Sequence, residues 1–361
     1  MPAPSLEETM RRVLALPREA GTPEAAEARE IVAAHLAALG YRVTPQPFRF
    51  HPGGLLAFPV FGAGLGGLAL LLVPLLTFGG PPGWGAGVVL VAGLGALALL
   101  SLGIGLGWVP LGGEMREDAN LLAVRSELPV RRWLVAHLDT KAQRQSMAGR
   151  LIAVWVVALA SAVLLALAAV RIGGPVPLAA AAAGAALAAL AGALAGRGRL
   201  RGRSRGARDN GSGIAAALAA AEKLEDPSVG VLVTGAEEFG LVGARVFARM
   251  EGSRLAGVEI VNFDTIDGEG EIYLVSHDRR GAGLASREAP RLAGLGPAVL
   301  ARRLPLGILV DSLPLARAGA AAITVGRLTW HTLRRIHTPD DVPEDLSLEL
   351  AERIGRAIAA N

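Results

Sequence analysis

The hydrophobic and polar positions of this 361-residue chain follow two different patterns. Four segments are apolar over about 18 or more residues without a charge, enough for a helix to cross roughly 30 Å of hydrocarbon. These segments are 55–78, 86–108, 151–170 and 178–195. The short turns GGPPGWG and RIGGPVP join the first segment to the second and the third to the fourth. We therefore expect four transmembrane helices in two hairpins.

Outside the hairpins, the pattern alternates between helices and strands. Thr22 and Pro23 begin a helical pattern that ends at Gly40, and YRVTPQPFRF then alternates like a strand. Further strands are expected at 120–125, 133–139, 230–234, 258–264 and 271–275, and helices after Asn210, Val242, Asp311 and Leu346. This alternation predicts an α/β sandwich with a mostly parallel central sheet between helices.

The hairpins divide the chain into five segments. One globular domain is expected in three pieces, 1–54, 109–150 and 197–361, and the hairpins 55–108 and 151–196 interrupt it. The three pieces together have an ordinary size for one domain.

Composition supports a membrane protein and narrows its chemistry. Hydrophobic residues make up 52% of the chain, more than in an average soluble domain. The chain has no cysteine, which excludes disulfides and thiolate metal sites. The net charge is +4, and the basic residues are arginines except for Lys141 and Lys223. This balance favours an anionic lipid surface over a nucleic-acid groove, so we expect a lipid bilayer and no nucleic acid as a partner.

Polar residues that could carry chemistry collect where predicted strands end and helices begin. Each of them alone is more often a structural residue or a solvated surface group. The set comprises His137, Asp139, Asp209, Glu237, Glu238, Asp264 and His337. In open α/β sheets, ligands bind beyond the carboxyl ends of the strands. Imidazoles and carboxylates without thiolates suit a pair of zinc ions that share a bridging carboxylate.

In order and wording, six motifs resemble those of the co-catalytic di-zinc aminopeptidases, the family-28 metallopeptidases. The motifs are AHLDT, GARDNGSG, TGAEEFGLVGAR, VNFDTIDG, DSLPLARAGAAA and IHTPDD. The resemblance covers the chain outside the hairpins, including the amino-terminal GTPEAAEAREIVAAHLAALGYRV. It implies the zinc-aminopeptidase fold, two zinc ions and a peptide substrate.

The resemblance also implies a metal-ligand set. Asp209 would be the carboxylate that bridges the two ions. His137 and Asp264 would complete one zinc site, and Glu238 and His337 the other.

Two further residues receive catalytic roles from the resemblance. Glu237 would be the general base that takes a proton from metal-bound water and passes it to the leaving amine. Asp139 would orient His137. The family pattern further implies a cis peptide bond between Asp209 and Asn210.

Two alternatives from other classes stay open. A catalytically silent membrane receptor or scaffold of the same fold should have lost ligands or the base, and all of them are present here. A single-zinc acyltransferase similar to the glutaminyl cyclases would leave His137 and Asp264 without a metal to hold. The motifs favour an aminopeptidase, while the peptide end that is recognised and the oligomeric state stay open.

The distribution of arginine predicts the membrane orientation. Both hairpins leave the globular domain and return to it, so the termini and the site share one side. That side carries six arginines between Arg197 and Arg208, whereas the opposite turns carry Arg171 alone. The positive-inside rule then predicts a multi-pass protein of the cell (inner) membrane with a cytoplasmic catalytic domain. The start MPAPSLEETMRRVLAL lacks the features of a signal peptide, which agrees with this orientation.

Overall fold

The computed structural model describes residues 4–78, 80, 83–305 and 307–360, and the chain forms two compact units. Unit 1 comprises Met1–Phe50, Met115–Ala142 and Gly202–Asn361, and unit 2 comprises His51–Glu114 and Gln143–Arg201. The four junctions lie near, but not at, the segment boundaries expected from the sequence.

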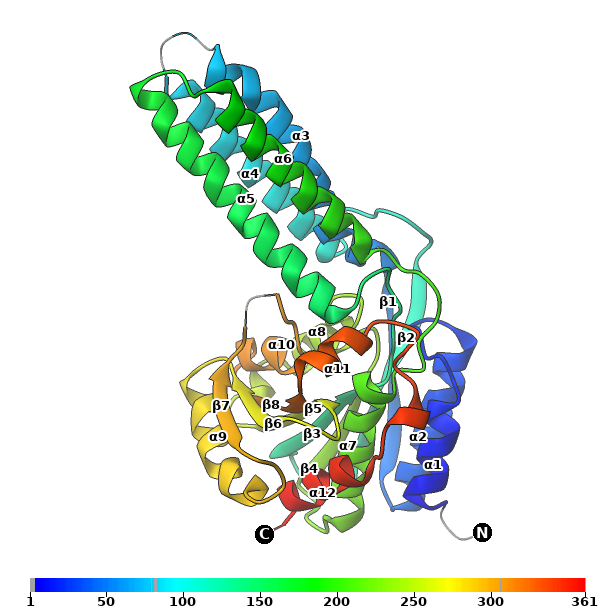
Figure 1. Cartoon of the computed structure of the whole chain (residues 1–361). Coiled ribbons are helices and arrows are strands. Elements are labelled where there is room, and N and C mark those ends of the chain that lie inside the picture. Colours follow the sequence, from blue (N-terminus) through cyan, green and yellow to red (C-terminus); the bar gives the residue numbers. More distant parts are fainter. Residues whose placement is uncertain (1–3, 79, 81–82, 306, 361) are drawn as a thin grey trace. The chain divides into compact units, whose positions relative to one another are not determined.

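Within its described residues, unit 1 contains one eight-stranded mixed sheet (Figure 1). The spatial order is β1 (Arg42–Phe50), β2 (Arg116–Val124), β4 (Val229–Thr234), β3 (Arg132–His137), β5 (Glu259–Ile266), β8 (Ala321–Leu328), β6 (Glu271–Ser276) and β7 (Val299–Arg303). The pairs β3–β4, β3–β5, β5–β8 and β6–β7 are parallel. The pairs β1–β2, β2–β4 and β6–β8 are antiparallel. The predicted α/β sandwich with a mostly parallel sheet is confirmed, although the sequence prediction omitted β7 and β8.

Helices cover both faces of this sheet (Figure 1). The core on the first face includes residues of α1 (Leu6–Leu14), α2 (Pro23–Ala38), α7 (Gly213–Lys223), α9 (Arg279–Leu292) and α12 (Glu349–Ile358), of which α1 and α12 pack on the other helices. The second face packs against α8 (Val242–Glu251) and α10 (Ser312–Arg317). Because successive strand residues point to opposite faces, Leu134 and Ala136 of β3 join the first core, while Trp133 and Val135 join the second.

The first helix–strand pair shows why the local sequence adopts these elements. The Thr22 hydroxyl accepts a hydrogen bond from the Ala25 N–H at 3.3 Å, and Pro23 occupies the first helical turn of α2. The helix ends before Gly40, whose φ of 84° lies in the left-handed region that favours glycine. Pro45 and Pro47 are tolerated in β1 because β1 is an edge strand.

In its described residues, unit 2 consists mainly of four long helices. They are α3 (Ala57–Thr77), α4 (Gly85–Gly105), α5 (Met147–Gly173) and α6 (Leu178–Ala195). All four are long and apolar enough to cross a membrane. Large apolar side chains such as Leu70, Leu99 and Trp155 are exposed on their outer faces. Helices that are apolar on all sides are typical of membrane spans.

Small residues allow α3 and α6 to approach closely. A Cβ added at Gly192 of α6 would lie 2.7 Å from the carbonyl oxygen of Gly62 in α3. A Cβ at Gly62 would in turn overlap the Cβ of Ala195. This packing uses glycine and alanine in the way that helices associate in lipid, where close van der Waals contact replaces the hydrophobic effect.

Arg171, in the last turn of α5, connects the two hairpins. The Arg171 Nε donates to the carbonyl of Leu75 at 3.0 Å, and its Nη2 donates to the carbonyl of Gly80 at 3.2 Å. Arg171 thus satisfies carbonyls near the end of α3, where the helix leaves its own acceptors unpaired.

The contact between α12 and α7 predicts a stability change. A Cβ at Gly355 of α12 would overlap the carbonyl oxygen of Ala216 in α7, and this backbone atom cannot rotate away. We expect Gly355→Ala to destabilise the protein by about 1–3 kcal/mol, as overpacking does. Gly283→Ala in α9 is the matched control, because its Cβ would meet only the distant end of the Arg287 side chain at 3.8 Å. The control should gain up to about 1 kcal/mol from helix propensity. Thermal unfolding in detergent checks both, and equal melting temperatures would contradict the packing argument.

Candidate metal centre

Three neighbouring parallel strands bring the predicted chemistry to one edge of the sheet. The strands β4, β3 and β5 lie side by side, so their carboxyl ends meet. His137 ends β3 opposite Thr234, which ends β4. Glu237 and Glu238 follow β4 after two intervening residues, and Asp264 lies in β5 where its pairing with β8 becomes irregular.

Asp209 reaches the same edge from the segment before α7. It lies in η3 (Ala207–Ser212) with non-helical backbone angles, φ −117° and ψ 90°. The peptide bond from Asp209 to Asn210 is cis, as the sequence resemblance implied. The Asn210 side chain donates to the carbonyl of Phe263 at 2.9 Å and accepts from the N–H of Thr265 at 3.2 Å. These bonds fix the segment carrying Asp209 against the end of β5.

A second anchor comes from the loop that carries His337. The Asp341 carboxylate accepts hydrogen bonds from the N–H groups of Arg208 at 2.9 Å and Asp209 at 3.0 Å. His337 lies in the same loop with a φ of 66°, and its side chain is buried. The backbone of Asp209 and the imidazole of His337 are therefore positioned by one short loop.

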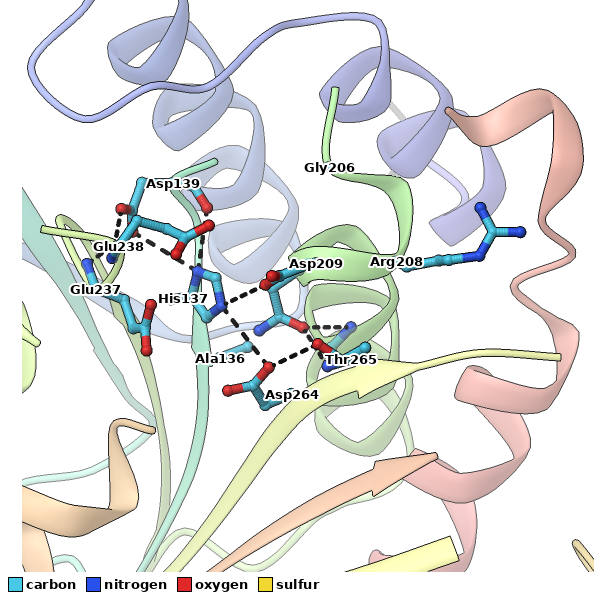
Figure 2. Close-up of polar contacts among 12 residues, drawn as sticks. Ala136, His137, Asp139, Gly206, Arg208, Asp209, Glu237, Glu238, Asp264 and Thr265 are labelled. Carbon is cyan, nitrogen blue, oxygen red and sulfur yellow. Dashed lines mark hydrogen bonds and ion pairs between the residues drawn. The ribbon is translucent and has the colours of Figure 1, made fainter. Parts of the chain in front are cut away.

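The side chain of Asp209 lies between the two imidazoles. One carboxylate oxygen, Oδ1, is 3.1 Å from His137 Nε2, and the other, Oδ2, is 3.0 Å from His337 Nε2. Asp264 Oδ1 lies 3.9 Å from His137 Nε2, and Glu238 Oε2 lies 3.5 Å from His337 Nε2. Figure 2 shows His137, Asp209 and Asp264 converging.

Two groups of potential metal ligands result, and Asp209 belongs to both. We call His137, Asp209 and Asp264 the first ligand group, and Asp209, Glu238 and His337 the second ligand group. Within each group the ligand atoms lie within 4.8 Å of one another. The structure thus brings all five predicted ligands together, and their metal-binding role stays a prediction.

Asp139 fixes the acidic pair after β4. Its carboxylate accepts from the N–H of Glu237 at 2.9 Å and from the N–H of Glu238 at 3.1 Å (Figure 2). The Nδ1 of His137 lies 3.1 Å from the main-chain carbonyl of Asp139 and 3.7 Å from its carboxylate. The contact with His137 that the sequence predicted is therefore present mainly through the carbonyl, while the carboxylate holds the predicted base and its neighbour.

Burial dominates the electrostatics of the site. Burial raises the pKa of Glu237 well above its usual range, the pKa of Asp264 to about 6 and the pKa of Asp311 to about 7. Burial also opposes ionisation of Asp209, but hydrogen bonding to His137 and His337 lowers the pKa of Asp209 far below its usual range. Nearby divalent ions would favour the charged form of all these carboxylates.

The composition of the site fits zinc. Its nitrogen and oxygen donors are those that zinc accepts, and Asp209 has one oxygen directed at each ligand group. In the described part of the chain, the buried Glu238 Oε1 has no hydrogen-bond partner. Buried carboxylates are costly unless a cation or hydrogen bonds compensate them. Metal ions in both ligand groups would provide that compensation.

Sequence reasoning missed four buried residues around the centre. They are Arg18, Lys141, Asp311 and Asp341. Asp311 and Asp341 stand within the DSLP and IHTPDD motifs, which could have indicated them. Lys141 forms an ion pair with Glu238. The rarity of lysine in this arginine-rich sequence could have drawn attention to Lys141.

Arg18 had no comparable sequence signal. Its guanidinium donates to the carbonyls of Leu138 at 2.8 Å, Arg205 at 2.6 Å and Gly206 at 3.0 Å. It thereby connects the end of β3 with the segment that leads to Asp209.

Comparisons with known proteins agree with this architecture. Residues 188–361 match the model of peptidase family M28. No curated protein sequence matches the chain.

Several solved structures share the fold. The aminopeptidase from Aneurinibacillus sp. strain AM-1 has a TM-score of 0.56 at 15% identity, over 98% of this chain and 92% of that chain. A zinc aminopeptidase from Bacillus subtilis has a TM-score of 0.55 at 14% identity, over 99% and 94%. The glutaminyl cyclase from Bacteroides thetaiotaomicron bound to N-acetylhistamine has a TM-score of 0.57 at 14% identity, over 98% and 96%. At these identities the likeness shows the fold, which peptidases and cyclases have in common.

The shared position of Asp209 predicts unequal effects of ligand substitutions. Asp209→Asn removes a charge from both ligand groups, whereas Asp264→Asn affects only the first and Glu238→Gln only the second. We expect Asp209→Asn to reduce bound zinc more than either other change, because a ligating carboxylate must be deprotonated and charged. Elemental analysis after zinc loading and desalting measures the content. A normal zinc content in Asp209→Asn would contradict the shared-ligand geometry.

Proposed function

We propose that the chain is a membrane-integral exopeptidase, an aminopeptidase, that hydrolyses peptide bonds with two zinc ions, because residues 188–361 match the model of peptidase family M28. The observation that carries the proposal is the position of Asp209, with one carboxylate oxygen facing each imidazole at 3.1 and 3.0 Å. A carboxylate in this position can bridge two ions. The other two residues of each ligand group can then supply further ligands to the ion of that group.

The residues of this chain divide the chemistry between them. When bound, two zinc ions would supply Lewis acidity that lowers the pKa of water and polarises a scissile carbonyl. Glu237 takes a proton from the attacking water as the new C–O bond forms. It then gives a proton to the leaving nitrogen as the C–N bond breaks. The hydrogen bonds from Glu237 and Glu238 to Asp139 keep this base in place while Glu238 serves the second ligand group.

A glutaminyl cyclase activity is the second candidate, because proteins with that activity share the fold. A one-zinc cyclase would use one ligand group and leave the other without a metal. The close approach of His137, Asp209 and Asp264 favours the two-ion peptidase. A catalytically silent scaffold is disfavoured because every predicted ligand and the predicted base lie at one edge of the sheet.

The membrane part of the proposal rests on the sequence and on the helices of unit 2. All four helices are long and apolar enough to span a bilayer. The arginines between Arg197 and Arg208 lead directly from α6 to Asp209 in the chain, and Met147, where α5 begins, follows Asp139 after one short segment. We propose a multi-pass protein of the cell membrane with a cytoplasmic catalytic unit, which trims short or apolar peptides close to the bilayer.

Activity of the purified, zinc-loaded protein in detergent tests the catalytic proposal. We expect hydrolysis of peptides with a free amino terminus and none of amino-blocked peptides. Glu237→Gln should keep its zinc and lose about 100-fold or more of the turnover, as is typical of removing a general base. Glu225→Gln, an exposed carboxylate, is the matched control and should behave like the wild type.

The possible outcomes separate the candidates. Ammonia release from amino-terminal glutamine without peptide hydrolysis would establish the cyclase instead. Cleavage of amino-blocked peptides from the carboxyl end would show that the protein is a carboxypeptidase and not an aminopeptidase. Near-normal turnover in Glu237→Gln would overturn the role of this residue.

The orientation is tested by fusions after Asn361. A cytoplasmic carboxyl terminus predicts a fluorescent green-fluorescent-protein fusion and an inactive alkaline-phosphatase fusion, because arginine-rich flanks are retained in the cytoplasm. The opposite pattern would place the catalytic unit outside the cell. Immunoblots for equal expression of the two fusions provide the control.

A further inference from the structure

A lysine forms an ion pair with one member of the second ligand group. The Nζ of Lys141 forms an ion pair with Glu238 Oε2, the carboxylate oxygen that also lies 3.5 Å from His337 Nε2. The side chains of Lys141 and Glu238 are each only 3% exposed, so water screens the pair little. Burial, and after it the charge of Lys141, lower the pKa of His337. Lys141 thus acts on two of the three members of the second ligand group.

The first ligand group lacks an equivalent cation. Across the described residues, the ion pairs of Asp264 involve His137 alone, at 3.9 Å. Asp209 pairs with the two imidazoles and with no lysine or arginine within the same part of the chain. The two ligand groups therefore differ in charge, although each has one imidazole and two carboxylates.

The choice of lysine matters in a chain whose only other lysine is the exposed Lys223. An ammonium is a compact point charge on a flexible stem, whereas a guanidinium is a broad planar fork. A lysine can occupy a position close to that of a metal ion and can also leave it by rotating its stem. The broader, planar guanidinium of an arginine would be displaced from Glu238 less easily.

We propose that the ammonium of Lys141 neutralises Glu238 when no metal is bound to the second ligand group. A metal ion must displace this ammonium from Glu238 before the ion can bind to the group. This inference rests on the proposed two-zinc function and adds an order of loading to it. One zinc binds tightly to the first ligand group. The second zinc binds at least tenfold more weakly, because it must replace a cation that already neutralises one of its ligands.

The exchange involves no covalent change. The ammonium leaves Glu238 Oε2 as the divalent ion arrives, and the two cations repel each other at short distance. Replacing Lys141 by a neutral side chain removes the competitor and frees Oε2 of Glu238, whose Oε1 already lacks a hydrogen-bond partner in the described part of the chain. The second ligand group then gains affinity for metal, whereas the first group keeps its own.

Zinc titration of the metal-stripped, full-length protein in detergent tests this inference, with a chromophoric chelator as competitor. We expect two binding steps in the wild type, the second at least tenfold weaker. Lys141→Met and Lys141→Gln should strengthen the second step at least tenfold and leave the first within threefold. Lys223→Met is the matched control and should leave both steps unchanged. Lys141→Arg keeps the charge and should keep the second step weak.

The outcomes are distinguishable from a failure of the proposed function. A wild-type protein that binds no zinc would overturn the di-zinc function itself. Two wild-type steps of equal affinity, or an unchanged second step in both neutral variants, would overturn only the role of Lys141. Loss of the first step in both neutral variants would show that Lys141 supports the fold, and would overturn the inference as well.

Discussion

The burial of several carboxylates at one edge of the sheet is the constraint on which the rest of unit 1 depends. Asp139, Asp209, Glu237, Glu238 and Asp311 are all buried there. Carboxylates in such surroundings require cations or hydrogen bonds. The structure supplies backbone N–H groups to the carboxylate of Asp139, imidazoles to that of Asp209 and an ammonium to that of Glu238. The conformations of the loops around the centre therefore place a hydrogen-bond donor or a cation close to each of these three carboxylates.

The fold was predictable where local sequence carries its own signals. The cap at Thr22, the stop at Gly40 and the alternation in β1 made α2 and β1 recognisable. The central strand β8 escaped prediction because AAITVGRL is short, rich in small residues and interrupted by glycine, so it carries no clear period. Its position between β5 and β6 stabilises it through pairing on both sides, which only the tertiary structure provides.

The part of the site that lies in recognisable sequence motifs was predictable. Five candidate ligands and the candidate base stand at strand ends or in helix-opening turns, where their order could be recognised. The groups that hold them in place could not be found in this way. Arg18 donates a hydrogen bond to the carbonyl of Gly206, which lies 188 residues further along the chain. Such contacts join segments that lie far apart in the sequence, and no local sequence pattern indicates that these segments lie close together in the fold.

The order of the segments along the chain also has a consequence for biosynthesis. Asp209, Glu238, Asp264 and His337 all follow α6, the last of the four apolar helices. A ribosome therefore completes both hairpins while four of the five candidate ligands are still unmade. Since β4, β5 and β8 also follow α6, the centre of the sheet forms only afterwards. A nascent chain thus cannot assemble the candidate metal centre until its apolar helices have been synthesised.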